Sequence, residues 1–110
     1  MALQQLNYEF KVDNPVEFGH EWRHYGVVGS GDLEILMETK DLGGVVKIQV
    51  VTPVVGFDKV WGLVLEKIVT EKHLGNMSIE INDNNATPIV VSMRLRQALA
   101  EAAKDVQKEV

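Results

Sequence analysis

The apolar residues change their spacing along the chain, and this change limits the folds that the chain can adopt. In residues 6–12 apolar and polar residues alternate, which predicts a half-buried strand. In residues 57–73 the apolar residues recur at steps of three and four, which predicts an amphipathic helix. The strand would bury Leu6, Tyr8, Phe10 and Val12, and the helix would bury Phe57, Val60, Trp61, Val64, Leu65, Ile68 and Val69.

Turn-forming residues separate the remaining elements. Asn14-Pro15 ends the first strand, residues 41–44 and 83–85 predict turns, and Gly75 is the expected stop of the first helix. Thr87-Pro88 predicts the start of a second helix, with threonine as N-cap and proline at the first helical position. Further strands are expected over residues 25–28, 33–39, 45–54 and 77–82, with residues 16–25 read as a loop running into a strand. The second helix would bury Val91, Leu95, Ala98, Leu99, Ala102 and Val106.

This order of strands, helix, strand and helix predicts an α+β fold: a largely antiparallel sheet with two amphipathic helices packed on one face. The chain has 110 residues, of which 45% are hydrophobic. That is enough for one modest core that forms without metals or cross-links, so we expect a single domain over residues 1–110.

Composition excludes several classes of function. The chain has no cysteine, which excludes disulfides, thiolate metal sites and a cysteine nucleophile, and agrees with a cytoplasmic location. No apolar run is long enough to cross a membrane, and the N-terminal residues MALQQLNYEF lack a signal-peptide pattern. A net charge of -5 disfavours nucleic-acid binding and suits protein partners with basic docking surfaces.

Residues 20–24, HEWRH, match the H-E-x-x-H signature of zinc proteases. That chemistry requires His20 and His24 on one face of a helix, together with a third ligand and a cleft. Glycines bracket the segment, and the remaining histidine, His73, falls at the predicted end of a different helix. We therefore interpret the match as a polar loop or strand with solvated histidines.

Residues 26–36, GVVGSGDLEIL, place Ser30 between Gly29 and Gly31. The pattern is not a nucleophile elbow, because Val28 and Asp32 occupy the positions where that motif has glycine. It is also not a dinucleotide loop, because a strand follows it instead of a helix. Two interpretations remain: a turn with Ser30 at its tip, or a hydroxyl kept free of steric bulk so that another enzyme can modify it. Asp32 would position this loop or cap an Asx turn.

The same segment resembles the modification loop in the acyl carrier subunit of bacterial malonate decarboxylase. The family pattern V-G-S-G-D-L-E is present, and further matching pieces follow in order along the chain. They are VVTPVVGF (50–57), Trp61, DNNATP (83–88) and RLRQAL (94–99). One departure is the pair Asn84-Asn85, where the family commonly has an aromatic residue followed by glycine. The D-S-L signature of fatty-acid carriers is missing, and the related citrate lyase carrier matches less well around its loop.

The resemblance implies a non-catalytic acyl-carrier domain that is modified at Ser30, within the loop formed by Gly29, Gly31 and Asp32. Ser30 would carry 2'-(5''-phosphoribosyl)-3'-dephospho-CoA through a phosphodiester attached by a dedicated phosphoribosyl-dephospho-CoA transferase. Its thiol would hold acetyl and malonyl groups in turn, which fits a chain without a thiol of its own. The implied partners are the acyl-transferase subunit and the catalytic subunits of malonate decarboxylase.

Two questions stay open at the level of sequence: the kind of protein and the role of two arginines. The chain would also suit a citrate lyase carrier with the same arm, or an interaction module in which the glycines and Ser30 form only a turn. Arg94 and Arg96 would face the phosphates of the arm, a partner or solvent.

Overall fold

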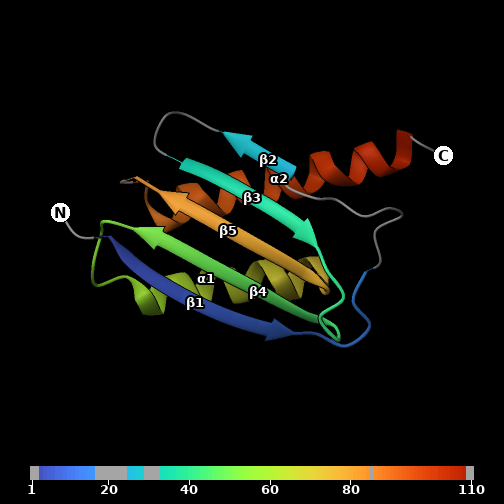
Figure 1. The fold of residues 1–110 in the computed structure, drawn as a ribbon, viewed down its shortest axis with the longest axis horizontal. Helices are drawn as coiled ribbons and strands as arrows, with labels where there is room; N and C mark the ends of the chain where they lie inside the picture. The colour runs from blue at the N-terminus through green and yellow to red at the C-terminus, as the bar shows by residue number, and fades with distance from the viewer. Residues whose placement is uncertain (1–2, 17–24, 29–32, 85, 109–110) are drawn as a thin grey trace.

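The computed structural model describes residues 3–16, 25–28, 33–84 and 86–108, and for residues 25–28 and 101–108 the description is limited to the backbone (Figure 1). Five strands and two helices lie within these residues. They are β1 (Gln4–Lys11), β2 (Tyr25–Val28), β3 (Leu33–Thr39), β4 (Val45–Thr52), α1 (Asp58–Lys72), β5 (Met77–Asp83) and α2 (Pro88–Lys108).

The strands form one sheet in the order β1-β4-β5-β3-β2. Every neighbouring pair is antiparallel except β4 and β5, which run parallel. The parallel pair follows from the chain between the two strands, because parallel neighbours require a crossover and α1 supplies it. The predicted, largely antiparallel sheet is therefore confirmed, with one parallel pair at its centre.

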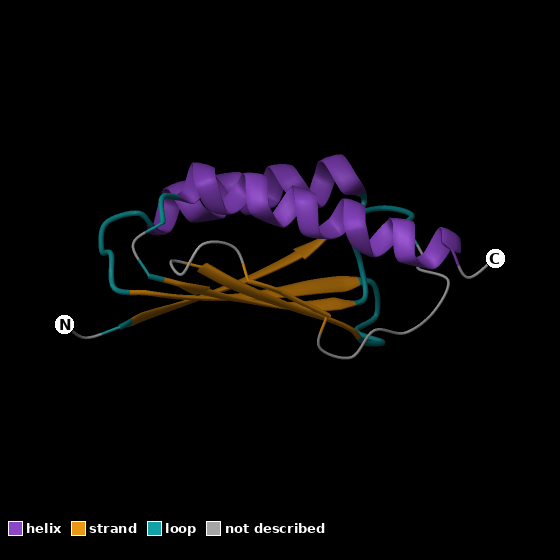
Figure 2. Cartoon of the chain, turned by 90° about the horizontal axis from the view of Figure 1, so that it is seen from above, coloured by secondary structure: helices purple, strands orange, loops and turns teal. Residues whose placement is uncertain are grey.

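Both helices cover the same face of the sheet, as predicted (Figure 2). The core lies between the two layers and is built from the alternate residues of the strands, with Ile48 and Ile79 almost fully buried. Their neighbours Lys47 and Glu80 are exposed on the opposite face. The helices contribute Trp61, Leu65, Ile68, Val69, Val91, Leu95, Ala98 and Leu99 to this core.

The apolar stripe of α1 is narrower at its start than the sequence predicts. Phe57 is 42% exposed and Val60 is 40% exposed, although both were expected in the core. Phe57 precedes the helix, so its side chain does not follow the helical phase. Val60 lies one residue before the buried Trp61, and one residue corresponds to about 100° of rotation, which places it at the border of the stripe.

Two predicted boundaries are also corrected. Strand β4 ends at Thr52 instead of continuing to residue 54, because Pro53 has no N–H to donate to a neighbouring strand. Helix α1 does not stop at Gly75: His73 adopts the left-handed conformation (φ 50°) and its N–H donates to the carbonyl of Thr70. The sequence pointed to glycine because glycine is the commonest residue in that conformation.

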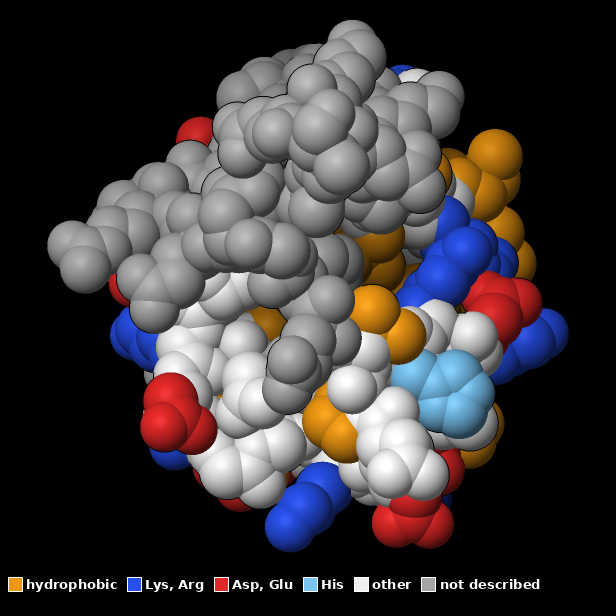
Figure 3. Space-filling view, turned by 90° about the vertical axis from the view of Figure 1, so that its right-hand side faces the viewer, with side chains coloured by type: hydrophobic (Ala, Val, Ile, Leu, Met, Phe, Trp, Pro, Cys, Tyr) orange, Lys and Arg blue, Asp and Glu red, His pale blue; other side chains and the backbone are white. Residues whose placement is uncertain are grey.

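Gly75 has a packing role at the end of the molecule where β5 begins. A Cβ atom added to Gly75 would lie 2.8 Å from the carbonyl oxygen of Gly44 and would also meet the ring of Pro15. Asn76 follows, and its Oδ1 accepts hydrogen bonds from the N–H groups of Leu42 (3.0 Å) and Gly44 (2.7 Å). The predicted turn over residues 41–44 is thus fastened to the start of β5. Figure 3 faces this end, where acidic, basic and apolar side chains are mixed.

Candidate functional site

The ends of several strands and the starts of both helices meet at one edge of the sheet. Because β4 and β5 are parallel, their last residues Thr52 and Asp83 lie at the same edge. Strand β3 begins there, with Leu33 paired to Asp83 in the ladder, and β2 ends there at Val28. Both helices also start at this edge, on the left of Figure 1. We call the edge defined by Val28, Leu33, Thr52 and Asp83 the carboxyl edge.

The predicted loop residues Gly29, Ser30, Gly31 and Asp32 lie outside the described residues, as do His20, His24 and Asn85. What the structure does describe is the pair of residues that flank the loop in the chain. Val28 and Leu33 both lie at the carboxyl edge. Among the described residues, no group of three or more histidine, aspartate or glutamate side chains is arranged to hold a metal ion.

The buried carboxylate of Asp83 forms hydrogen bonds that link several segments at the carboxyl edge. Asp83 is only 5% exposed, and its Oδ2 accepts a hydrogen bond from the hydroxyl of Thr52 at 2.8 Å. Its Oδ1 accepts a second bond from the N–H of Ala86 at 2.7 Å. The Thr52 hydroxyl oxygen in turn accepts from the N–H of Val54 at 3.1 Å. These bonds join the ends of β4 and β5 to the segment that leads into α2.

The sequence predicts a turn over residues 83–85 and a helix start at Thr87-Pro88, and it does not reveal this network. A signal was present, because Asp83 continues the inward-facing alternation of β5 through Ile79 and Ile81. Thr52 likewise follows Val50 on the inward face of β4. A polar residue at the buried phase of a strand requires a hydrogen-bond partner, and here the two residues satisfy each other.

The start of α2 matches the prediction. Pro88 is the first helical residue, and the hydroxyl oxygen of Thr87 accepts a hydrogen bond from the N–H of Val90 at 3.3 Å. The first backbone bond of the helix runs from the N–H of Val91 to the carbonyl of Thr87 at 3.0 Å. Threonine therefore caps one of the free N–H groups at the helix start, at the carboxyl edge.

Arg96 joins the two helices. Its Nε lies 3.0 Å from Oε2 of Glu71 on α1, and both side chains are partly exposed. Sequence reasoning left Arg96 open between the arm, a partner and solvent, and missed this pair because the two residues are 25 positions apart. Periodicity within one helix carries no information about a contact with another. Arg94 is half-buried on the same helix.

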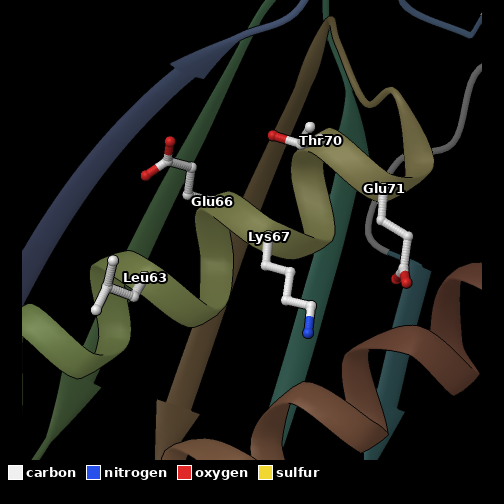
Figure 4. A pocket seen from close by; sticks show the side chains of 5 residues that line it. All are labelled: Leu63, Glu66, Lys67, Thr70 and Glu71. Carbon is white, nitrogen blue, oxygen red and sulfur yellow. The ribbon is translucent and has the colours of Figure 1, made fainter.

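A shallow hollow lies on the outer side of α1. Leu63, Glu66, Lys67, Thr70 and Glu71 line it (Figure 4). The lining comes from one helix, so the hollow is open on its other sides and does not enclose a small molecule. No described helix is both long enough and apolar enough to cross a membrane.

Comparison with known proteins identifies the family. The family model described as Malonate decarboxylase delta subunit (MdcD) matches residues 20–102. The malonate decarboxylase acyl carrier protein of Malonomonas rubra is 58% identical over 100 residues, covering 91% of this chain and 89% of that protein. The protein of the same name from Xanthomonas campestris pv. campestris (strain B100) is 41% identical over 97 residues, covering 88% and 92%.

A solved structure agrees with these relatives. The chain superposes with a TM-score of 0.70 and 34% identity on a chain in the crystal structure of a Pseudomonas malonate decarboxylase hetero-tetramer in complex with malonate. The match covers 90% of this chain and 98% of that chain. The shared fold and the matched residues define the class as acyl carrier proteins. Within that class, the chain belongs to the malonate decarboxylase delta-subunit family.

Proposed function

We propose that the chain is a cytoplasmic, non-catalytic acyl carrier subunit of malonate decarboxylase and that residues 1–110 form its single carrier domain. Ser30 would carry 2'-(5''-phosphoribosyl)-3'-dephospho-CoA, and Gly29, Gly31 and Asp32 would form the loop around it. The observation that carries this proposal is the V-G-S-G-D-L-E motif inside a family match that spans residues 20–102. The citrate lyase carrier is disfavoured, since the relatives described above are malonate decarboxylase carriers.

The chemistry of the chain fits this group. A phosphodiester requires a hydroxyl, which Ser30 supplies, and the chain contributes no thiol of its own. Asp83, which pairs with Leu33 in the ladder, turns its carboxylate inward to Thr52, so its charge is not presented to the phosphates of an arm. When bound, the group supplies the thiol on which acetyl and malonyl thioesters are carried.

Attachment would need only the serine hydroxyl and an activated donor. The Ser30 oxygen would form a bond to phosphorus and lose its proton, while the leaving group of the donor departs with the electrons of the broken bond. The phosphoribosyl-dephospho-CoA transferase would catalyse this step. The task of the carrier is then delivery, because a tethered acyl group reaches each partner active site at a high effective concentration.

Intact-mass spectrometry tests the proposal. The chain is co-expressed with its transferase, and we expect one large adduct on the wild type and none on Ser30→Ala. Ser78→Ala is a matched control, because Ser78 lies on β5 and its substitution also removes one hydroxyl. We expect this control to carry the adduct. Malonate decarboxylation by the assembled complex should be lost with Ser30→Ala, and full activity with that variant would refute the proposal.

The same experiment separates the carrier from an interaction module. In a module of that kind the glycines and Ser30 form only a turn, so neither the wild type nor Ser78→Ala would gain mass. Supplying citrate in place of malonate to the assembled complex tests the remaining alternative, and we expect turnover with malonate alone.

A further inference from the structure

Large apolar side chains are exposed unevenly over the described residues. Nine such side chains are at least 40% exposed, and seven of them fall in two short stretches. The first stretch, residues 55–63, leads into α1 and forms its first turns, and the second, residues 89–93, opens α2. The seven are Val55, Phe57, Val60, Leu63, Ile89, Val90 and Met93, and together we call them the helix-start patch.

The two stretches lie at the same end of the helix layer. Both helices begin at the carboxyl edge and run side by side over the sheet, joined further along by Glu71 and Arg96 (Figures 1 and 2). Leu63 projects from α1 on the side away from the strands (Figure 4). Leu63, Ile89 and Met93 are 69%, 68% and 64% exposed, so the described residues leave them almost uncovered.

The location matters because Val28 and Leu33, which flank the predicted attachment loop, lie at the same edge. A protein that covers the helix-start patch would therefore sit beside the point where the chain enters and leaves residues 29–32. Contiguous exposed apolar patches of about several hundred Å² on a protein surface often mark interaction sites.

We propose that the helix-start patch is the docking surface for one partner, the acyl-transferase subunit of malonate decarboxylase. This inference rests on the proposed carrier function. The complementary surface on that subunit would be an apolar area beside the mouth of the active site that receives the acyl group. Leu63, Ile89 and Met93 would be the central contacts, because their side chains are the most exposed helical members of the patch.

Charge and location favour an enzyme subunit over a second copy of this chain. The seven side chains expose roughly 600 Å² of apolar surface at ordinary side-chain sizes, and a standard interface buries about 800 Å² per partner, of which only part is apolar. The patch is therefore large enough to form the centre of an interface, beside the residues that flank the predicted attachment loop. The net charge of -5 makes two copies repel each other and attracts a basic partner. The charges beside the patch are mixed: Asp58 and Glu66 lie next to Lys59 and Lys67 on α1, and Arg94 follows Met93 on α2, so the repulsion between copies comes from the net charge of the whole chain.

The test measures delivery by the modified carrier. The variant Leu63→Gln/Ile89→Gln/Met93→Gln replaces exposed side chains, and glutamine is accepted in helices, so the fold should be retained. We expect the KM of the acyl-transferase subunit for the modified carrier to rise at least tenfold, with kcat at saturating carrier within about twofold of wild type. Val16→Gln is the matched control: it also removes an exposed apolar side chain, but at the far end of α1, where the Val16 N–H bonds to His73. Its KM should equal that of wild type.

Each other outcome has a defined meaning. Mass spectrometry first confirms the arm on every carrier, and if wild type gains no adduct, the proposed function itself fails. If the adduct is present and the KM values are unchanged, the docking proposal fails while the carrier function stands. A folded triple variant that is no longer modified would assign the patch to the phosphoribosyl-dephospho-CoA transferase. A wild-type dimer that dissociates in the triple variant would assign the patch to a second copy of the chain. Both results overturn the proposal. If circular dichroism shows that the triple variant is unfolded, the single variant Leu63→Gln decides, with an expected KM increase of about threefold.

Discussion

The two ends of the sheet are held together differently. At the carboxyl edge, two buried side chains, Thr52 and Asp83, bond to each other and join the ends of β4 and β5. At the opposite end, Asn76 binds the backbone of the turn over residues 41–44, and Gly75 packs against the backbone of Gly44. One end thus depends on a bond between two buried side chains, and the other on one side chain that binds backbone N–H groups together with close backbone packing.

The ends also differ in what they offer to a partner. The helix-start patch lies beside the carboxyl edge, whereas a single exposed large apolar side chain, Val16, lies at the opposite end among the described residues. The polar groups of Asp83 and Thr52 are satisfied internally, which leaves the carboxyl edge free to present apolar surface. With the proposed docking role of the helix-start patch, one end would serve stability and the other would combine stability with recognition.

The largest effect is expected for Asp83→Ala. The substitution leaves the Thr52 hydroxyl and the Ala86 N–H without their buried acceptor, which should lower the free energy of unfolding by about 3 kcal/mol. Urea denaturation measures the loss. Because Asp83 pairs with Leu33, we also expect slower adduct formation at Ser30 at temperatures where the variant is folded. Asp83→Asn keeps the side-chain volume and one hydrogen-bond acceptor, so its free energy of unfolding should fall by less. Equal losses of stability in the two variants would contradict the role of the network.

Gly75→Ala probes the opposite end. The added Cβ would lie 2.8 Å from the Gly44 carbonyl oxygen, and backbone atoms cannot move aside as a flexible side chain can. We expect a loss of about 2 kcal/mol in the free energy of unfolding, measured by urea denaturation. Adduct formation at Ser30 should be unchanged in the folded variant. The comparison between the two ends would break down if Gly75→Ala slowed the modification as much as Asp83→Ala.

A smaller effect is expected for the ion pair between the helices. Glu71→Gln removes the charge that faces Arg96, and since both side chains are partly exposed, the loss should be about 0.5 kcal/mol or less. Thermal unfolding at low and high salt measures it, and the difference from wild type should shrink as salt increases. Glu66→Gln, an exposed carboxylate of α1 that points away from Glu71 (Figure 4), serves as the control for loss of a negative charge alone. A loss that persists at high salt would show that Glu71 contributes through packing instead.

The smallest effect concerns Tyr8, which lies where β1 packs beneath the start of α1. Burial, and secondly the negative charge of Asp58, raise the pKa of Tyr8 above its ordinary value of 10.0. The neutral hydroxyl donates a hydrogen bond to the carbonyl of Asp58 at 2.7 Å. Because the folded protein holds the proton more tightly than the unfolded chain, this contribution is complete below pH 10 and is lost as the pH rises through the raised pKa.

Ultraviolet titration of the tyrosines checks this shift. We expect Tyr8 to ionise above the ordinary range, and the Tyr8→Phe variant should lack that component. Asp58→Asn should lower the pKa of Tyr8 only in part, since burial is the larger cause. A full return to the ordinary value in that variant would reverse the order of the two causes.

Much of the fold could be predicted from local patterns. The bounds of β3, Leu33–Thr39, and the capped start of α2 at Thr87 and Pro88 agree with the prediction because both depend on neighbouring residues in the chain. The two wrong boundaries, at the ends of β4 and α1, also have local causes: Pro53 lacks an N–H group, and His73 adopts the left-handed conformation. Of the candidate site, the motif around Ser30 came from sequence, and its geometry stays a prediction.

By itself, the sequence determined the type and order of the elements, the faces that they bury and the family to which the chain belongs. Periodicity encodes the elements and their faces, because each depends on residues a few positions apart, whereas the family follows from the matching motifs along the chain. Only the tertiary structure decided that β4 and β5 are parallel neighbours, that Thr52 meets Asp83, and that residues 55–63 and 89–93 share one end of the helix layer. Each of these contacts joins segments about thirty positions apart, and such neighbours are chosen by packing of the whole sheet and not by any local pattern.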